Sequence, residues 1–495
     1  MTKITSDIVF KNGLVVTPSG VIEGGIAVAD GKIAAVASDA FLPDAEQIID
    51  LGGKHLLPGV IDPECHLGGH RDLAADFKSE TRAAAATGVT TWGLQLVSLA
   101  ITGGADKVKG PSDIPNFTKS MPTFYEASKT AAIDFFLTPI ISTDEQVKEI
   151  PYLANEHGIS SFKLHLQMQG PWKSSWPAYF FDDGSIYSVF QEVAKLGAIA
   201  LLHCENWEIA QVLQKQLMDA GRTDMGAWDD RSPAFTEVGH ARTYLYYARI
   251  AGCPIYVVHC TTTDTVAEIE RAKADGLTVY SEIGTHYLVL HKDAWKINVP
   301  LRDRSTHESL WKALSSGAID CIGSDHVAHT RTRESMETGN VFTTISGFPS
   351  RVEGMLPMML SEGVNKGRIS IERLAQVASE NPARIFGLYP KKGAILPGAD
   401  ADLVVVDLKR RAKIAKELLH TVTPWSIYEG WDVTGWPVMT VVRGNIVMEW
   451  PEGAPRAMVT ETSHHETHEG HEDQRATTRT GDLTCYLFYS CPSCP

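Results

Sequence analysis

The chain has 495 residues, of which 43% are hydrophobic and 21% charged, so a large core is possible and wholesale disorder is excluded. Its 45 Lys and Arg residues against 60 Asp and Glu residues give a formal net charge of −15, which argues against non-specific nucleic-acid binding. No apolar run approaches the roughly 20 residues of a membrane helix, and the start Met1–Asp7 has no apolar leader segment. Eight cysteines are ordinary usage for this length, so we expect a soluble cytoplasmic protein.

Both ends of the chain carry short β signals. Asp7–Gly13 predicts a strand that runs into an Asn-Gly turn, and Gly25–Val36 predicts a hairpin with Asp-Gly at its tip. β character returns after residue 387, with a strand at Ala401–Asp407 and a hairpin from Val438 to Trp450.

Between these ends, short apolar runs alternate with helical stretches such as Val266–Asp275. Near-continuous apolar strands separated by helices indicate a parallel sheet. Eight such units over roughly 280 residues predict a (β/α)₈ barrel. A doubly wound open sheet is the alternative, but its glycine-rich nucleotide turn is not evident. The eight runs are Leu56–Ile61, Thr91–Val97, Phe135–Ile141, Ser161–Leu166, Ala198–Cys204, Pro254–Cys260, Leu277–Ile283 and Ile319–Gly323.

The predicted organisation is an α/β chain with a barrel at residues 56–387 and a small β-sandwich domain built from residues 1–55 plus 388–455. Residues 456–495 are predicted to form a disordered tail. Four histidines of this tail could bind metal adventitiously, and its Cys491-Pro492-Ser493-Cys494 would need a folded setting or a second cysteine pair to form a site. The four are His464, His465, His468 and His471.

Polar residues stand at the carboxyl ends of five predicted barrel strands, where barrel enzymes place catalysis. A single histidine there is more often structural, but burying so many ionisable groups on one face would be costly unless a cation organises them. Imidazole with carboxylate suits Zn²⁺, Mn²⁺, Fe²⁺ or Co²⁺. The five ends are Asp62–His66, Ser161–His165, Leu202–Glu205, Val258–Cys260 and Gly323–His326.

Four motifs carry a resemblance to a known family: Leu57–Pro63, Phe162-Lys163, Asn381–Leu388 and Tyr428–Pro437. Together they resemble the cyclic-amidase branch of the amidohydrolase superfamily, which holds hydantoinases, dihydropyrimidinases, allantoinases and dihydroorotases. The resemblance runs from about residue 7 to residue 450. It implies a metal-dependent hydrolase, expected as a homotetramer, that cleaves a C–N bond of a cyclic amide or imide in a small molecule.

The resemblance also implies two divalent metal ions per subunit, with zinc first and Mn, Co or Fe as alternatives. A carbamate on Lys163 would turn a cation into a bidentate anion that bridges both ions. A water shared by the ions would supply a bridging hydroxide, and Asp325 would accept its proton and return it to the leaving nitrogen. The implied ligands are Glu64, His66, carboxylated Lys163, His203, His259 and Asp325.

The first ligand departs from the family pattern of two histidines with one residue between them. Glu64 replaces the first histidine and keeps its spacing to His66. A coordinating carboxylate would lower the effective charge of its metal and favour a harder ion such as Mn²⁺ or Fe²⁺. Alternatively, Glu64 swings away and the first metal site is weak or empty, with His70 as a spare imidazole. A mononuclear centre therefore stays open.

The substrate side follows no single member of the branch. Met168 stands where hydantoinases carry an oxyanion-binding tyrosine, so the oxyanion must be stabilised by the metals or by His165 or Gln167. Asn298 follows the dihydroorotase and allantoinase pattern and His329 follows the dihydroorotase pattern, and both are expected to touch substrate.

Two further features bear on the choice of substrate. Gly68 stands where dihydroorotases place a carboxylate-binding arginine, so dihydroorotate is not expected unless Arg71 takes over. Trp172, Trp176 and Tyr179, with Phe180 and Phe181, indicate an apolar pocket or a subunit interface.

Two alternatives to cyclic-amide hydrolysis stay open. The first is a hydrolase of an acyclic amide, carbamate, thiocarbamate or urea on the same scaffold. The second is a catalytically silent scaffold protein, which would have no physical need for the ligands that this chain retains.

Overall fold

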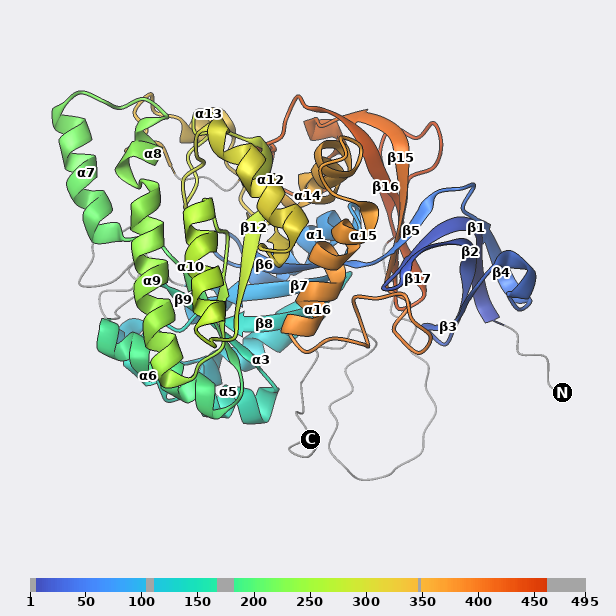
Figure 1. The fold of residues 1–495 in the computed structure, drawn as a ribbon, viewed down its shortest axis with the longest axis horizontal. Helices are drawn as coiled ribbons and strands as arrows, with labels where there is room; N and C mark the ends of the chain where they lie inside the picture. Colours follow the sequence, from blue (N-terminus) through green and yellow to red (C-terminus); the bar gives the residue numbers. More distant parts are fainter. Residues whose placement is uncertain (1–5, 104–110, 167–181, 346–348, 461–495) are drawn as a thin grey trace.

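The computed structural model describes residues 6–103, 111–166, 182–345 and 349–460. Figure 1 shows a sheet-rich part beside a larger part in which helices surround strands. In the sheet-rich part, strands from the N-terminal end (blue) lie beside strands from the C-terminal end (orange to red). The predicted four histidines and C-x-x-C of the tail lie outside the described residues.

One nine-stranded sheet joins the two ends of the chain. Its order is β18-β17-β16-β15-β5-β1-β2-β3, with β4 paired to β1. The two ends meet where β15 pairs antiparallel with β5. The strands are β1 Ser6–Thr17, β2 Gly20–Ala29, β3 Lys32–Ala37, β4 Ala45–Asp50, β5 His55–Pro58, β15 Leu403–Lys413, β16 Asp432–Val442, β17 Asn445–Glu449 and β18 Met458–Val459. The sheet thus continues past residue 455, where the tail was predicted to begin.

Turn chemistry explains two of its hairpins. Asp30 and Gly31 both have positive φ between β2 and β3, as the Asp-Gly motif predicted. Arg443 and Gly444 also both have positive φ, between β16 and β17. The Asn-Gly turn predicted at the end of the first strand is wrong: β1 continues through it, and Asn12 with φ 56° forms a bulge.

The second body is the predicted barrel of eight parallel strands. β9 to β13 form one sheet and β14, β6, β7 and β8 another. A bridge between Ile140 and Lys163 joins them on one side. On the other side, β13 pairs with β12 and β14 pairs with β6, so β13 and β14 are two short pieces that together form the eighth strand. The strands are β6 Val60–His66, β7 Val89–Leu96, β8 Asp134–Pro139, β9 Ser161–His165, β10 Ile199–His203, β11 Ile255–Val257, β12 Val279–Gly284, β13 Cys321–Gly323 and β14 His326–Val327.

The first predicted barrel strand, Leu56–Ile61, is two strands in different sheets. Residues up to Pro58 belong to β5, and the barrel begins with Val60. Gly59 is the crossing point, and a Cβ there would lie 2.2 Å from the Thr90 hydroxyl. A residue with a side chain would therefore force the barrel and the sheet apart at this point.

Helices cover the outside of the barrel in Figure 1. Asp72, Asn206 and Thr262 cap α1, α7 and α10 by accepting from a backbone N–H, and Gly252 ends α9 in a left-handed conformation. The α-helices are α1 Leu73–Ala85, α2 Ser98–Thr102, α3 Phe117–Ser128, α4 Asp144–Val147, α5 Ile150–His157, α6 Asp183–Lys195, α7 Trp207–Asp219, α8 Ala227–Arg231, α9 Ala234–Ala251, α10 Thr263–Ala274, α11 Thr285–Val289, α12 His307–Ser316, α13 Arg333–Met336, α14 Val352–Met358, α15 Ile371–Ala375 and α16 Asn381–Ile385. Short 3₁₀ turns are Asp39–Phe41, Pro111–Asp113, Arg304–Thr306 and Lys416–Leu418, and π turns are Met359–Val364 and Gln376–Glu380.

A buried ion cluster links the barrel to the sheet. The Lys392 ammonium lies 2.6 Å from Asp134, the first residue of β8, and 3.3 Å from Asp400. It also contacts Asp402, which precedes β15. All four side chains are buried. Among the described residues, no helix is both long and apolar enough to cross a membrane.

Candidate metal centre

The predicted ligands meet at one end of the barrel. β6 carries Glu64 and His66, β9 carries Lys163, and β10 ends with His203. The remaining two, His259 and Asp325, follow β11 and β13 directly. Both have positive φ, 37° and 48°, which is uncommon for residues other than glycine and is often associated with functional sites.

One half of the centre is formed by Glu64, His66 and Asp325. They offer ligand atoms that all lie within 4.8 Å of one another. His66 Nε2 is 3.2 Å from Asp325 Oδ1, and its Nδ1 lies 2.8 Å from the Gln95 carbonyl oxygen. That carbonyl can accept only from an Nδ1–H, which leaves the Nε2 lone pair directed at the centre.

The other half is formed by two histidines. His259 Nε2 lies 2.8 Å from His203 Nδ1. The opposite nitrogen of His203 faces the Glu205 carboxylate at 3.5 Å, and Glu205 in turn accepts from Ser232 and pairs with Arg231. Burial and His203 hold the pKa of His259 well below its usual value, so this ring is neutral and can act as a ligand. A carboxylate behind a histidine is the usual support for a metal ligand.

Lys163 lies beside Glu64, whose Oε1 is also 4.0 Å from His259 Nε2 of the other half. The Lys163 Nζ is 2.8 Å from Glu64 Oε1 and 2.8 Å from Gln95 Oε1, and Lys163 is fully buried. Burial raises the pKa of Glu64, but Lys163, Glu282 and His66 together lower it below its usual value. Burial and Glu64 raise the pKa of Glu282 far above its usual value, so Glu282 is protonated and can donate to Glu64.

Arg351 was not found by the sequence analysis, yet its guanidinium lies beside Asp325. Arg351 Nη2 is 3.0 Å from Asp325 Oδ2, and Nη1 is 3.5 Å from His286 Nε2. Burial raises the pKa of Asp325, but Arg351 and His66 together lower it below its usual value, so Asp325 is ionised. Arg351 follows no predicted strand, so its position carried no sequence signal.

A second set of missed residues holds the strand ends in place. Asp62 accepts from the Trp92 indole at 2.7 Å and from the Ser324 hydroxyl at 2.6 Å, which ties β6 to the segment after β13. His326 Nε2 lies 2.9 Å from Glu80 of α1. Asp62 and His326 stood in the strand-end motifs, but their partners are distant in sequence.

The predicted substrate residues lie around the centre to different extents. The His165 ring lies 5.0 Å from the His203 ring and 6.3 Å from the His66 ring, measured between centroids. Asn298 is half-buried, and its Oδ1 is buried without a hydrogen-bond partner among the described residues.

The loop residues near the centre take other partners. His329 is buried and packs edge-on against His70, which is absent from the described ligand group. The Arg71 guanidinium pairs with Asp76 at 2.7 Å. Gln167, Met168 and the aromatic residues from Trp172 to Phe181 lie outside the described residues.

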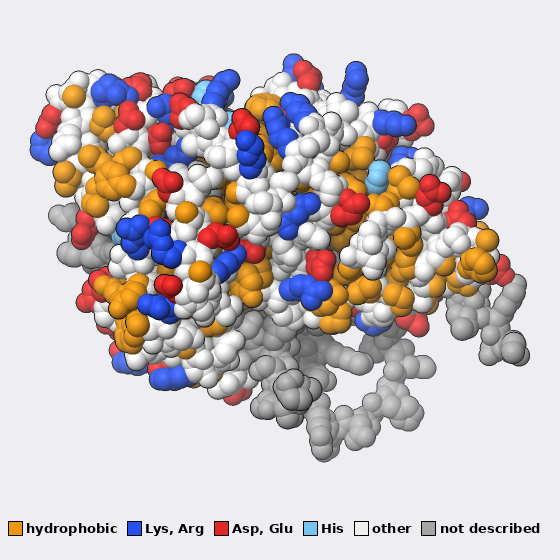
Figure 2. All heavy atoms as spheres, viewed as in Figure 1, with side chains coloured by type: hydrophobic (Ala, Val, Ile, Leu, Met, Phe, Trp, Pro, Cys, Tyr) orange, Lys and Arg blue, Asp and Glu red, His pale blue; other side chains and the backbone are white. Residues whose placement is uncertain are grey.

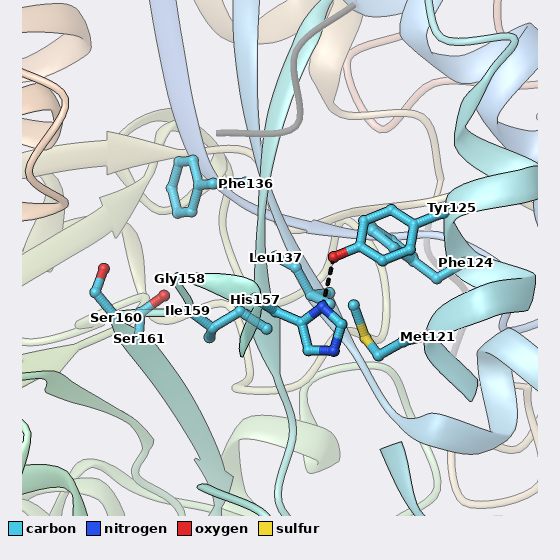
Figure 3. Close-up of a pocket in the computed structure, with 10 residues that line it drawn as sticks. All are labelled: Met121, Phe124, Tyr125, Phe136, Leu137, His157, Gly158, Ile159, Ser160 and Ser161. Atoms are coloured by element: carbon cyan, nitrogen blue, oxygen red, sulfur yellow. Dashed lines mark hydrogen bonds between the residues drawn. The ribbon is translucent and has the colours of Figure 1, made fainter. Parts of the chain in front are cut away.

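A separate pocket lies away from these ligands, where β9 begins. Figure 3 shows it between α3, α5 and the strands, with a hydrogen bond of 2.8 Å between Tyr125 and His157. Most of its lining side chains are apolar, and it holds no cluster of ligands. This pocket is therefore separate from the group formed by Glu64, His66 and Asp325.

The chain is similar to known proteins over most of its length. Residues 167–447 match the model of the Amidohydrolase family. The chain is 33% identical over 454 residues to the L-hydantoinase of Paenarthrobacter aurescens, a match that covers 90% of this chain and 94% of that one. It is 29% identical to the allantoinase of Bacillus licheniformis, covering 90% and 97%. A crystal structure of a D-hydantoinase matches with a TM-score of 0.78 at 32% identity, covering 89% and 94%.

Proposed function

This chain belongs to the amidohydrolase family, and on that premise we propose that it hydrolyses a C–N bond of a cyclic amide or imide with the help of divalent metal ions. The observation that carries the proposal is the convergence of two carboxylates, three imidazoles and one lysine at the carboxyl end of the barrel. The relatives named hydantoinase and allantoinase support the class of substrate.

The donor set fits a pair of metal ions. We propose that Glu64, His66 and Asp325 hold one ion and that His203 and His259 hold the other, with Lys163 between them. Carboxylate and neutral imidazole suit zinc, which we propose first, and also manganese, cobalt and iron. When bound, the ions supply an activated water and polarise the substrate carbonyl.

We propose that Lys163 is carboxylated in the loaded enzyme. Support comes from its position 2.8 Å from Glu64 of the ligand group and from its complete burial. The reaction joins the Lys163 amine to carbon dioxide and releases a proton, so it requires the amine rather than the ammonium. Glu64 Oε1 lies 2.8 Å from Lys163 Nζ, so metal ions must compete with Lys163 for Glu64 before the carbamate can form.

The chain's own residues would move the proton and hold the substrate. Asp325 would accept the proton of the attacking water and return it to the leaving nitrogen. Asn298 and His329 are proposed to contact the substrate, because the Asn298 oxygen is buried and available and His329 lies in the loop after β14. His165, and Gln167 from the undescribed segment, are proposed to stabilise the oxyanion.

We propose a cytoplasmic homotetramer. The five described cysteines, Cys65, Cys204, Cys253, Cys260 and Cys321, are free and buried, as expected in a reducing compartment. Figure 2 shows apolar side chains on the face that carries α7 and α9, and exposed apolar groups mark interfaces. They include Val212 and Met218 on α7 and Phe235, Tyr246 and Ile250 on α9.

Metal analysis combined with a substrate screen tests the proposed function. The protein would be produced with Mn²⁺, Zn²⁺ or Co²⁺ and assayed on hydantoins, dihydropyrimidines, allantoin, cyclic imides and carbamates. We expect metal in the wild type, hydrolysis of a cyclic substrate, and loss of both in Lys163→Ala. Lys215→Ala, which removes an exposed lysine on α7, is the control and should change neither.

Other results of that screen have defined meanings. A mass increase of one carbon dioxide on the peptide with Lys163, measured under non-acidic conditions, would support the carbamate. Turnover of carbamates alone would favour the acyclic alternative. Absence of metal after metal-replete growth, with no turnover, would contradict the proposal and favour a silent scaffold.

A further inference from the structure

Hydrogen bonds before Arg351 and close packing after it fix the backbone that carries this residue. The Ser350 N–H donates to the Trp425 carbonyl at 3.0 Å, and the Ile427 N–H donates back to the Ser350 carbonyl at 3.3 Å. A Cβ on Gly354 would lie 2.1 Å from the Tyr428 ring, so glycine lets this ring pack against α14. The Arg351 side chain therefore leaves from a backbone whose position is fixed by the 425–428 segment.

The guanidinium and the metal centre hold opposite oxygens of the same carboxylate. Asp325 Oδ1 is 3.2 Å from His66 Nε2, whereas Oδ2 is 3.0 Å from Arg351 Nη2. Arg351 is fully buried, and its other terminal nitrogen lies 3.5 Å from His286. The contact with Asp325 is a buried ion pair and the contact with His286 is a hydrogen bond, so the guanidinium has one charged and one polar partner.

We propose that Arg351 is a positioning residue that holds Asp325 with one oxygen directed at the metal centre, an inference that rests on the proposed function. Asp325 has φ 48°, so its backbone is in a sparsely populated region and its side chain needs contacts that fix it. Burying the charges of Arg351 and Asp325 is costly, and removing Arg351 would leave the Asp325 charge buried without this partner. Of the two carboxylates in the ligand group, Asp325 pairs with Arg351 and Glu64 pairs with Lys163.

Kinetics of Arg351→Lys and Arg351→Ala test the proposal in the full-length, metal-loaded enzyme. With a cyclic substrate that the wild type hydrolyses, we expect kcat of Arg351→Ala to fall by about 10- to 100-fold, the usual effect of losing the partner of a ligand. KM should change by less than about threefold, because the substrate is still bound. The kcat of Arg351→Lys should lie between the values for the wild type and Arg351→Ala. Guanidinium at low millimolar concentration should restore part of kcat in Arg351→Ala.

The control is Arg373→Ala. Arg373 is half-buried and donates to the carbonyls of Leu314 and Ile319, far from Asp325 in the fold. Arg373→Ala should lower the melting temperature without lowering kcat, and guanidinium should not raise the kcat of this variant. Wild-type kcat in Arg351→Ala, or an equal loss of kcat in both variants without guanidinium rescue, would overturn the proposal.

A second readout does not depend on turnover. We expect the affinity for Mn²⁺, measured by competition with a chelator, to fall by about 10- to 100-fold in Arg351→Ala. In an Asp325→Asn background the same change should have no further effect, because the carboxylate to be positioned is gone. Equal losses in both backgrounds would overturn the proposal. Failure of the wild type to hydrolyse any cyclic substrate would contradict the proposed function, and this cycle would still decide the role of Arg351.

Discussion

At the scale of single residues, the exchange of one ligand changes the electrostatics of the whole centre. The family resemblance places a histidine where Glu64 stands, and a neutral imidazole could not form an ion pair with Lys163. Here the two charges are 2.8 Å apart and at most 1% exposed. Lys163 therefore competes with a metal ion for the lone pairs of the Glu64 carboxylate.

Glu64→His should shift the metal preference of the centre toward zinc. An imidazole is a softer ligand than a carboxylate and adds no negative charge, so zinc should gain over manganese. We expect the ratio of bound zinc to bound manganese, measured by elemental analysis after equilibration with both ions, to rise by about tenfold or more. Glu64→Gln is the control, because it removes the charge without adding a good ligand and should lower total metal. An unchanged ratio in Glu64→His would contradict a ligand role for Glu64.

Lys296 should make stability depend on pH in the alkaline range. Burial, followed by Arg231, lowers its pKa from 10.5 to about 7, although its ammonium can donate to the carbonyls of Val341 and Thr344. Between pH 7 and pH 10.5 the unfolded chain binds more protons at this lysine than the folded chain does, so stability rises with pH.

The difference in free energy of unfolding between wild type and Lys296→Met isolates this effect. We expect it to move in favour of the wild type by up to about 1.4 kcal/mol per pH unit above pH 7. Urea unfolding at several pH values would measure it, and other titrating groups cancel in the difference. A difference that does not change with pH would show that Lys296 keeps its proton in the folded protein.

At the scale of elements, the strands of the barrel were predictable because they are buried on both faces. Such strands are nearly continuous apolar runs, and all eight predicted runs contain or overlap a strand. The first predicted run did not separate the two strands at Gly59, because β5 is also largely apolar and leads directly into β6. Composition cannot distinguish one long strand from two short ones in different sheets.

Gly323→Ala should damage the centre through a neighbouring strand. A Cβ at this end of β13 would lie 2.5 Å from Glu282 Oε1 on β12, and Glu282 is held by the Tyr256 hydroxyl at 2.8 Å. The carboxyl group would have to move toward Glu64. We expect a loss of about 1–3 kcal/mol in the free energy of unfolding, together with reduced metal content.

The matched control for this change is Gly239→Ala on α9. Nothing lies within 4 Å of a Cβ there, and alanine favours a helix. We expect this variant to be unchanged or stabilised by roughly 0.5–1 kcal/mol, with full metal content. Thermal unfolding and elemental analysis of both variants would decide, and full metal content in Gly323→Ala would contradict the predicted link between Glu282 and the centre.

At the scale of the whole molecule, the sequence predicted the ligands of the metal centre better than the residues that hold those ligands in place. Carboxyl ends of parallel strands meet at one end of a barrel, so Glu64, His203 and Asp325 could be brought together from strand positions alone. The groups that hold them could not be found in this way. Glu80 supports His326 from 246 residues away, and Arg351 reaches Asp325 from a segment without a strand or motif.

Lys392→Met should weaken the junction between the barrel and the nine-stranded sheet. Its ammonium is shared by Asp134 at the start of β8 and by Asp400 and Asp402 before β15, and it is 1% exposed. The variant would leave three buried carboxylates close together without this cation, which we expect to cost about 3–5 kcal/mol in the free energy of unfolding. Burial raises the pKa of Asp402, so the loss of stability in Lys392→Met should shrink as the pH falls and the carboxylates are protonated.

The control Lys215→Met removes an exposed partner of Asp219 and should cost no more than about 1 kcal/mol. Urea unfolding of both variants at pH 7 and pH 5 would measure these effects, and equal costs at pH 7 would mean that the cluster does not stabilise the junction.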